Sequence, residues 1–272
     1  TICTMPAHPF QQTLRKRIRR IKKQADALSR VCRQKDLHLL RIELKRLRAL
    51  LRLLRYTDPE FPYFKVYQPF KVLFNRAGQL RFWQIQIKLL ENTATAPEPF
   101  SNRYRCYSEY RRHLANHLFR ETARWGDLPR WRDVKNLFRI SLERCNTEAL
   151  ADYFTYTRES ATGIVGRVGR TLPAERHELR KIMKEYTMNR QLVSRHFNFD
   201  PGPLSAMPDD PALLDVPFGQ WHDLQAAGKQ LAEDLRIQPW DTAVLTCGRE
   251  VKAMRSIPPA SESRPRVSRA PG

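Results

Sequence analysis

Apolar residues recur at intervals of three and four along most of the chain, which is the spacing of one face of an α-helix. The first such stretch runs through Phe10, Leu14, Ile18, Ile21, Ala25 and Leu28. No segment shows the sustained alternation of apolar and polar residues that a half-buried strand requires. The pattern therefore predicts an all-α fold.

Proline and polar clusters divide the chain into segments of helical length. The expected breaks lie at residues 57–62, 92–102, 126–129, 173, 198–217 and 239. These breaks leave room for eight or nine helices in a single domain over residues 8–255. Residues 256–272 are rich in Pro, Ser and Arg and have no core pattern, which predicts a disordered tail.

The most informative predicted helix lies around His38. At about 100° per residue, the leucines between Leu37 and Leu54 form a wide apolar stripe, so we expect this helix to be largely buried. Glu43 is the only carboxylate between Leu37 and Arg55, and it projects from nearly the opposite side to the polar arc. That polar arc carries only basic side chains, which are His38, Arg41, Lys45, Arg48, Arg52 and Arg55.

An acid-free basic strip has two interpretations. It can be a solvated face on which Lys and Arg stems cover apolar neighbours, or it can be a surface to which an anion supplies the countercharge. The second is favoured, because like charges one turn apart repel each other. The composition agrees, since 49 Lys plus Arg stand against 28 Asp plus Glu and give a formal charge of +21. Such an excess favours nucleic acid, a phosphate polymer or an anionic membrane surface as the partner.

Part of this pattern occurs twice. Residues 36–45 and 175–184 both contain H-x-x-R-x-x-x-K, and the two copies are 139 residues apart. GQLRFWQ at 78–84 is followed at a similar offset by GQWHDLQ at 219–225. The repeat predicts two helical halves, about 8–126 and 127–255, related by a pseudo-two-fold axis. The basic positions of the second copy are His177, Arg180, Lys184 and Arg195, and a weaker strip on the first helix holds Arg15, Arg19 and Lys22.

These segments resemble the signatures of the CHAD domain family. Residues 37–54 look like the family's first signature, residues 175–186 look like its second, and residues 218–225 resemble the Gly-x-Trp-x-Asp stretch that follows. The resemblance covers about residues 10–250. It implies two four-helix-bundle-like halves around a basic central groove or pore, which binds inorganic polyphosphate, and an association with polyphosphate granules.

The resemblance also implies which side chains contact phosphate. The chain departs from the family's pattern at two places: Phe82 stands where members commonly carry Asp, and Glu185, Tyr186 and Thr187 stand where a basic run is typical of the second half. Arg52, Arg195 and the three basic residues of the first helix are further candidates from the strips themselves. The residues carried over from the family are His38, Arg41, Lys45, Arg48, Arg81, His177, Arg180, Lys181 and Lys184.

The residues themselves favour polyphosphate over nucleic acid. Polyphosphate has no bases, so Arg forks and Lys point charges without interleaved aromatic rings suit it. Single-stranded nucleic-acid binders usually add aromatic platforms, and residues 37–55 offer none before Tyr56. The alternative is a basic helical nucleic-acid-binding protein that uses residues 15–23 as its arm. A structural scaffold whose charge attracts acidic partners is a third hypothesis.

Catalytic, metal-binding and membrane-spanning interpretations have less support. The chain has no Glu-x-Glu-x-Lys set and no Ser/His/Asp or Cys/His grouping, so we expect neither enzymatic activity nor a cofactor. His113 and His117 lie one turn apart but lack an evident third ligand, so no metal site is expected. Five dispersed cysteines and the lack of a long apolar run predict a soluble, cytoplasmic protein.

Overall fold

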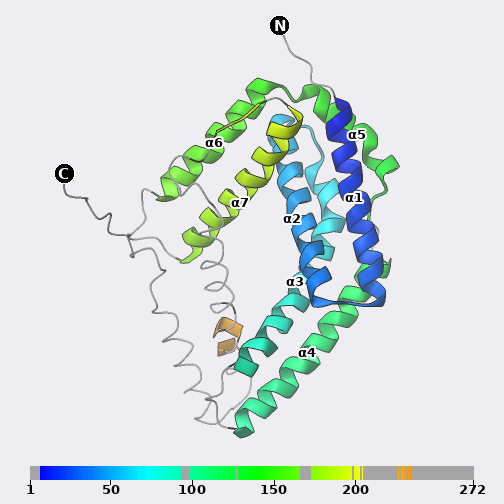
Figure 1. Ribbon diagram of the computed structural model, residues 1–272, viewed down its shortest axis with the longest axis vertical. Helices are drawn as coiled ribbons and strands as arrows, with labels where there is room; N and C mark the ends of the chain where they lie inside the picture. Colours follow the sequence, from blue (N-terminus) through cyan, green and yellow to red (C-terminus); the bar gives the residue numbers. More distant parts are fainter. Residues whose placement is uncertain are drawn as a thin grey trace, which may run out of the picture.

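The computed structural model describes residues 7–92, 98–125, 128–165, 173–197, 199–202, 204, 226, 228–230 and 232–233. Within these ranges the chain is helical and contains no strand, which confirms the all-α prediction (Figure 1). The repeat segment 219–225 and the expected tail at 256–272 lie outside the described residues. The helices are α1 (Ala7–Arg30), α2 (Gln34–Thr57), α3 (Tyr63–Asn92), α4 (Glu98–Trp125), α5 (Trp131–Arg144), α6 (Thr147–Val165) and α7 (Pro173–His196).

Most helix boundaries lie where proline and polar clusters predict them. The expected breaks at 57–62, 92–102 and 126–129 each separate two helices, and α7 begins at Pro173. The short break between α1 and α2, at residues 31–33, was not predicted, and neither was the break between α5 and α6. There the Asn146 side chain accepts a hydrogen bond from the backbone N–H of Ala149 (2.7 Å), which caps the start of α6 without any proline.

Helix α2 lies at the centre of the packing and contacts α1, α3, α5, α6 and α7. Its leucine stripe is buried, as is the apolar stripe of α1 from Phe10 to Leu28. The predicted buried stripe of this helix is too wide at one position, because Leu39 is 42% exposed. Leu39 lies beside His38 at the edge of the stripe, beyond the width that the neighbouring helices cover.

Helices α6 and α7 lie side by side, across from α2 (Figure 1). A small cluster of Ala161, Ile164, Leu179 and Met183 joins the two helices. The buried Asn189 amide of α7 donates to the backbone oxygen of Ala49 on α2 (3.1 Å) and bonds the Tyr153 hydroxyl on α6 (2.8 Å). These contacts hold α7 against the helix that carries the first basic strip. The pseudo-two-fold relation of two halves stays a prediction.

Candidate functional site

A cavity of about 530 Å³ lies between α2, α3 and α7. Its lining is dominated by basic side chains, and Glu185 is the only carboxylate among the described residues that line it. Nine of the fourteen candidates from the sequence meet here. They are His38, Arg41, Lys45 and Arg48 from α2, Arg81 from α3, and His177, Arg180, Lys181 and Lys184 from α7.

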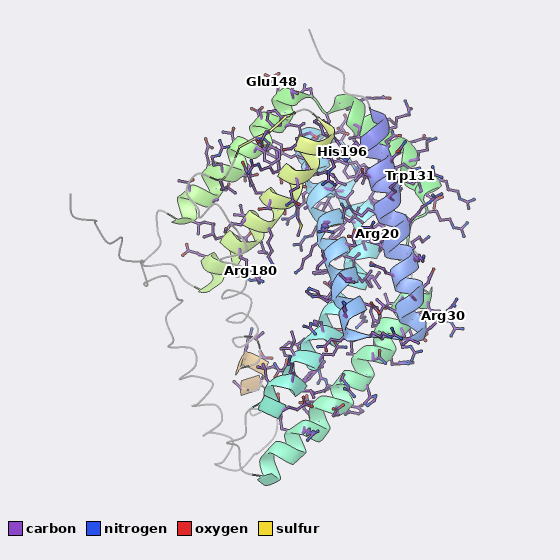
Figure 2. The ribbon with its side chains drawn as sticks, viewed as in Figure 1. Arg20, Arg30, Trp131, Glu148, Arg180 and His196 are labelled. Carbon is purple, nitrogen blue, oxygen red and sulfur yellow. The ribbon has the colours of Figure 1, made fainter. Side chains whose placement is uncertain are left out.

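The two H-x-x-R-x-x-x-K segments line this one cavity although they are 139 residues apart in sequence. Positions i, i+3 and i+7 lie on the same face of a helix, so each copy presents its His, Arg and Lys together. In Figure 2, Arg180 lies at the lower end of α7. The repeat therefore places two short basic faces at a common site.

Arg41 is held in position by two residues of α3. Its Nη1 donates to the backbone oxygen of Phe74 (3.1 Å), and its guanidinium carbon lies 4.5 Å from the centroid of the Phe74 ring. A Cβ atom at Gly78 would come within 2.7 Å of the same Nη1, so the absence of a side chain at Gly78 makes room for the guanidinium. This positioning role was not predicted; the glycine of the repeated GQLRFWQ segment was its only signal.

Lys45 is half-buried among the other cations of the cavity. Burial, together with the positive charges of neighbours such as Lys184 and Arg41, lowers the pKa of Lys45 to about 8, and burial is the largest of these causes. Burial also lowers the pKa of His38, with additional lowering by the charge of Arg81. An anion in the cavity would reverse these effects, because it favours the protonated form of each group.

The guanidinium group of Arg81 contains a buried hydrogen-bond donor for which the described residues provide no acceptor. Its Nη1 is buried and has no hydrogen-bond partner within the part of the chain that the structure describes. A buried donor without an acceptor costs about 1–3 kcal/mol. A bound oxyanion would supply the acceptor.

Glu185 lines the cavity and pairs with a residue of a neighbouring pocket. Its Oε2 accepts a hydrogen bond from Arg52 Nη1 (2.9 Å), and its Oε1 accepts one from the Tyr153 hydroxyl (3.3 Å). Arg52 is consequently paired across α2 and α7, and it lines a neighbouring pocket rather than this cavity. The basic strip of α2 thus divides between two pockets.

The other candidates lie away from the cavity. Arg15 and Arg19 are exposed on α1 and Lys22 is half-buried there, while Arg195 is exposed near the end of α7. None of the four is among the described residues that line the cavity. Their inclusion in a binding surface stays a prediction.

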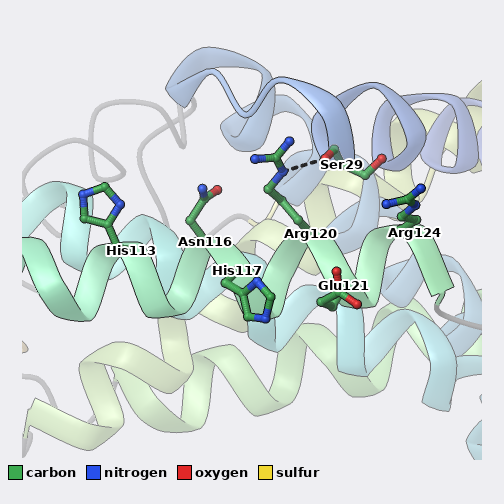
Figure 3. A pocket seen from close by; sticks show the side chains of 7 residues that line it. All are labelled: Ser29, His113, Asn116, His117, Arg120, Glu121 and Arg124. Atoms are coloured by element: carbon green, nitrogen blue, oxygen red, sulfur yellow. Dashed lines mark hydrogen bonds between the residues drawn. The ribbon is translucent and has the colours of Figure 1, made fainter.

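His113 and His117 are exposed on α4 beside the end of α1 (Figure 3). No group of three or more possible metal ligands occurs among the residues that the structure describes. Arg120, one turn further on, donates to the backbone oxygens of Ser29 and Arg30 (2.6 Å each) and so caps the end of α1. At this pocket, Arg120 thus joins α4 to the end of α1.

None of the described helices is both long and apolar enough to cross a membrane.

The fold and the site define an all-helical class of domain in which separated basic helix segments line one cavity. The model of the CHAD domain family matches residues 12–232, and the chain belongs to this family. The fold is similar to that in the crystal structure of the CHAD domain from the plant Ricinus communis, with a TM-score of 0.67 and 19% sequence identity. That similarity covers 94% of this chain and 89% of the plant chain. A comparison with curated proteins gave no match.

Proposed function

We propose that the cavity binds inorganic polyphosphate and that the protein is not an enzyme. The observation that carries the proposal is the charge of the described lining: seven Lys and Arg and two His surround the cavity, with one carboxylate. Membership of the CHAD family, which is associated with polyphosphate binding, supports the same ligand. A cytoplasmic location and an association with polyphosphate granules belong to this proposal.

The extended shape of polyphosphate fits the distribution of the basic side chains around the cavity. Polyphosphate is a flexible chain of repeated phosphates, and the basic side chains come from three helices rather than from one point. Arg can bind phosphate oxygens in a fork, whereas Lys acts as a mobile point charge. The mixture of Arg41, Arg180, Lys45 and Lys184 therefore suits an extended anion without a fixed outline.

The test is calorimetric titration of the full chain with long-chain polyphosphate at two salt concentrations. We expect saturable binding that weakens steeply with salt, because each neutralised phosphate releases counterions. Binding should also raise the melting temperature, since the ligand stabilises only the folded state. Absence of saturable binding at moderate salt would contradict the proposal.

Nucleic acid is the second candidate, because the exposed Arg15, Lys16 and Arg19 of α1 lie away from the cavity and could contact a separate backbone. Competition distinguishes the two ligands. If polyphosphate is the ligand, it displaces RNA, and RNA does not displace polyphosphate. A structural scaffold would show no preference among polyanions of equal charge density.

A further inference from the structure

A second pocket, of about 460 Å³, adjoins the polyphosphate cavity along α2 and α3. The two share Arg48 and Phe74 in their linings, and the Arg52–Glu185 ion pair joins a residue of each. The lining of the second pocket combines cations, aromatic rings and amides, and no carboxylate is among its described residues. They are Arg48, Arg52, Arg55, Tyr63, Phe64, Tyr67, Gln68, Lys71, Phe74 and Asn75.

The aromatic rings distinguish this pocket from a site for phosphate alone. Tyr63 stacks on Tyr67 with ring centroids 5.4 Å apart, and Phe64 meets Tyr63 edge to face at 5.2 Å. Aromatic faces carry partial negative charge and do not attract phosphate. They do stack on planar heterocycles, and such stacking is worth about 1–3 kcal/mol per base.

Not every ring is available to a ligand. Phe74 already lies under the guanidinium groups of Arg41 and Arg48, at 4.5 and 5.7 Å. Tyr67 is 5% exposed and belongs to the core. Phe64 is different, because 78% of its surface is exposed although it is a large apolar residue. Its ring lies in the pocket lining with little protein packed against it, where a planar ligand could cover it.

We propose that this pocket binds the nucleobase of a nucleoside polyphosphate, with the exposed ring of Phe64 as the stacking surface. Gln68 and Asn75 supply amides that can hydrogen-bond to base edges. Lys71 and Arg48 supply charge for the phosphates, which extend past Arg48 into the neighbouring cavity. Only this placement of the phosphates rests on the proposed function, namely that the neighbouring cavity binds polyphosphate. The pocket volume lies in the usual range for small-molecule sites.

A free nucleotide fits better than a nucleic-acid strand. A strand would require stacking surfaces at regular intervals along the basic path. Beyond the shared Phe74, the described lining of the larger cavity contains one aromatic residue, Phe82, among its many cations. A ligand with one base and a run of phosphates matches one aromatic pocket that adjoins a basic cavity.

The test compares ATP with inorganic tripolyphosphate, which has as many phosphates but no ring, by calorimetry on the full chain without divalent cations. We expect ATP to bind on the order of tenfold more tightly, which is within the range of base stacking. Phe64→Ala should bring the affinity for ATP down to that for tripolyphosphate and leave the affinity for tripolyphosphate unchanged. Because Phe64 is exposed, this substitution should not disturb folding, and circular dichroism checks that point.

Tyr110→Ala is the matched control, since Tyr110 is 65% exposed on α4 and lines neither pocket among the described residues. It should leave the preference for ATP unchanged. Equal affinities for ATP and tripolyphosphate, or a preference that survives Phe64→Ala, would overturn the proposal. Binding of an oligoadenylate but not ATP would also overturn it, in favour of a strand. Long-chain polyphosphate titrated in parallel tests the proposed function separately, because that binding does not need Phe64.

Discussion

Helix α2 takes part in two basic clusters that differ in how their charge is balanced. On the side facing α1, Arg17, Arg20 and Arg46 surround the buried carboxylate of Glu43 at 2.8, 3.3 and 2.9 Å. On the side facing α7, seven Lys and Arg surround a cavity whose described lining has one carboxylate, Glu185. The first cluster contains its own counterion at its centre, whereas the one carboxylate of the second is paired with Arg52, which does not line the cavity.

The pKa shifts express the same difference. Burial lowers the pKa of Arg17, but Glu43 acts in the opposite direction. For Lys45 the leading influences all lower the pKa, because burial is reinforced by the neighbouring cations. A dense group of basic residues is therefore a structural feature where an internal carboxylate compensates it. Where that compensation is weak, the group is a candidate site for an external anion.

Glu43→Gln should have the largest effect on stability. It leaves Arg17, whose side chain is 16% exposed, without its anion, and breaking a buried ion pair costs about 3–5 kcal/mol. Chemical denaturation would measure the loss in the free energy of unfolding. Glu143→Gln is the control, because the exposed Glu143–Arg139 pair should contribute less than about 1 kcal/mol. If the two losses were equal, Glu43 would not be the structural counterion that the geometry indicates.

The joint replacement of Arg41, Lys45 and Arg48 by Ala should have the largest effect on binding. We expect at least roughly a 100-fold loss of polyphosphate affinity, since contacts to charged groups contribute about 1.5–3 kcal/mol each. The salt dependence should also become less steep. Calorimetric titration at several salt concentrations measures both quantities.

The control for that variant removes the same charge from α1, by replacing Arg15, Arg19 and Lys22 with Ala. These residues lie outside the cavity, so the affinity should change by less than about threefold through the long-range field alone. An equal loss in both variants would place the α1 strip in the binding surface. It would also remove the distinction between the two sides of α2.

The helices and the basic face of α2 could be predicted because both follow from the period of a helix, whereas the meeting of basic residues from separate helices was an implication of the family resemblance. The stripes of α1 and α2 and the clustering of His38, Arg41 and Lys45 on one face need only positions three, four and seven apart. Pairings between distant segments could not be predicted in this way. Glu185 approaches Arg52 from 133 residues away, and the space that Gly78 leaves for Arg41 depends on how α3 packs on α2.

Polyphosphate binding should weaken as pH rises through the pKa of Lys45, which is about 8. Phosphate favours the charged amine, so binding takes up a proton wherever the free protein has lost it. Between pH 7 and 9 the affinity should fall roughly tenfold on this account. Calorimetry in two buffers with different ionisation enthalpies counts the protons, and Lys45→Arg should abolish most of the pH dependence. A steep pH dependence in that variant would assign the proton to another group.

The stability of the free protein should change with pH in the opposite direction to its affinity for polyphosphate. The pKa of Lys45 is lower in the folded state than the ordinary value of 10.5, so the unfolded chain binds more protons between pH 8 and 10.5. The contribution of Lys45 therefore makes the folded protein more stable as pH rises through that window. Thermal unfolding of the wild type and Lys45→Arg isolates this contribution.

The smallest effect is expected from the carboxylate that the cavity does contain. Glu185→Gln removes a negative charge from the lining, while an amide oxygen can still accept a hydrogen bond from Arg52 or Tyr153. Polyphosphate affinity should rise about threefold, because the ligand no longer meets a like charge. Glu159→Gln is the control on the neighbouring helix α6, because Glu159 is exposed and is not among the described residues that line the cavity. If Glu185→Gln weakened binding, the Arg52–Glu185 pair would be shaping the cavity, and the excess of basic residues in the lining would not by itself account for the binding of the anion.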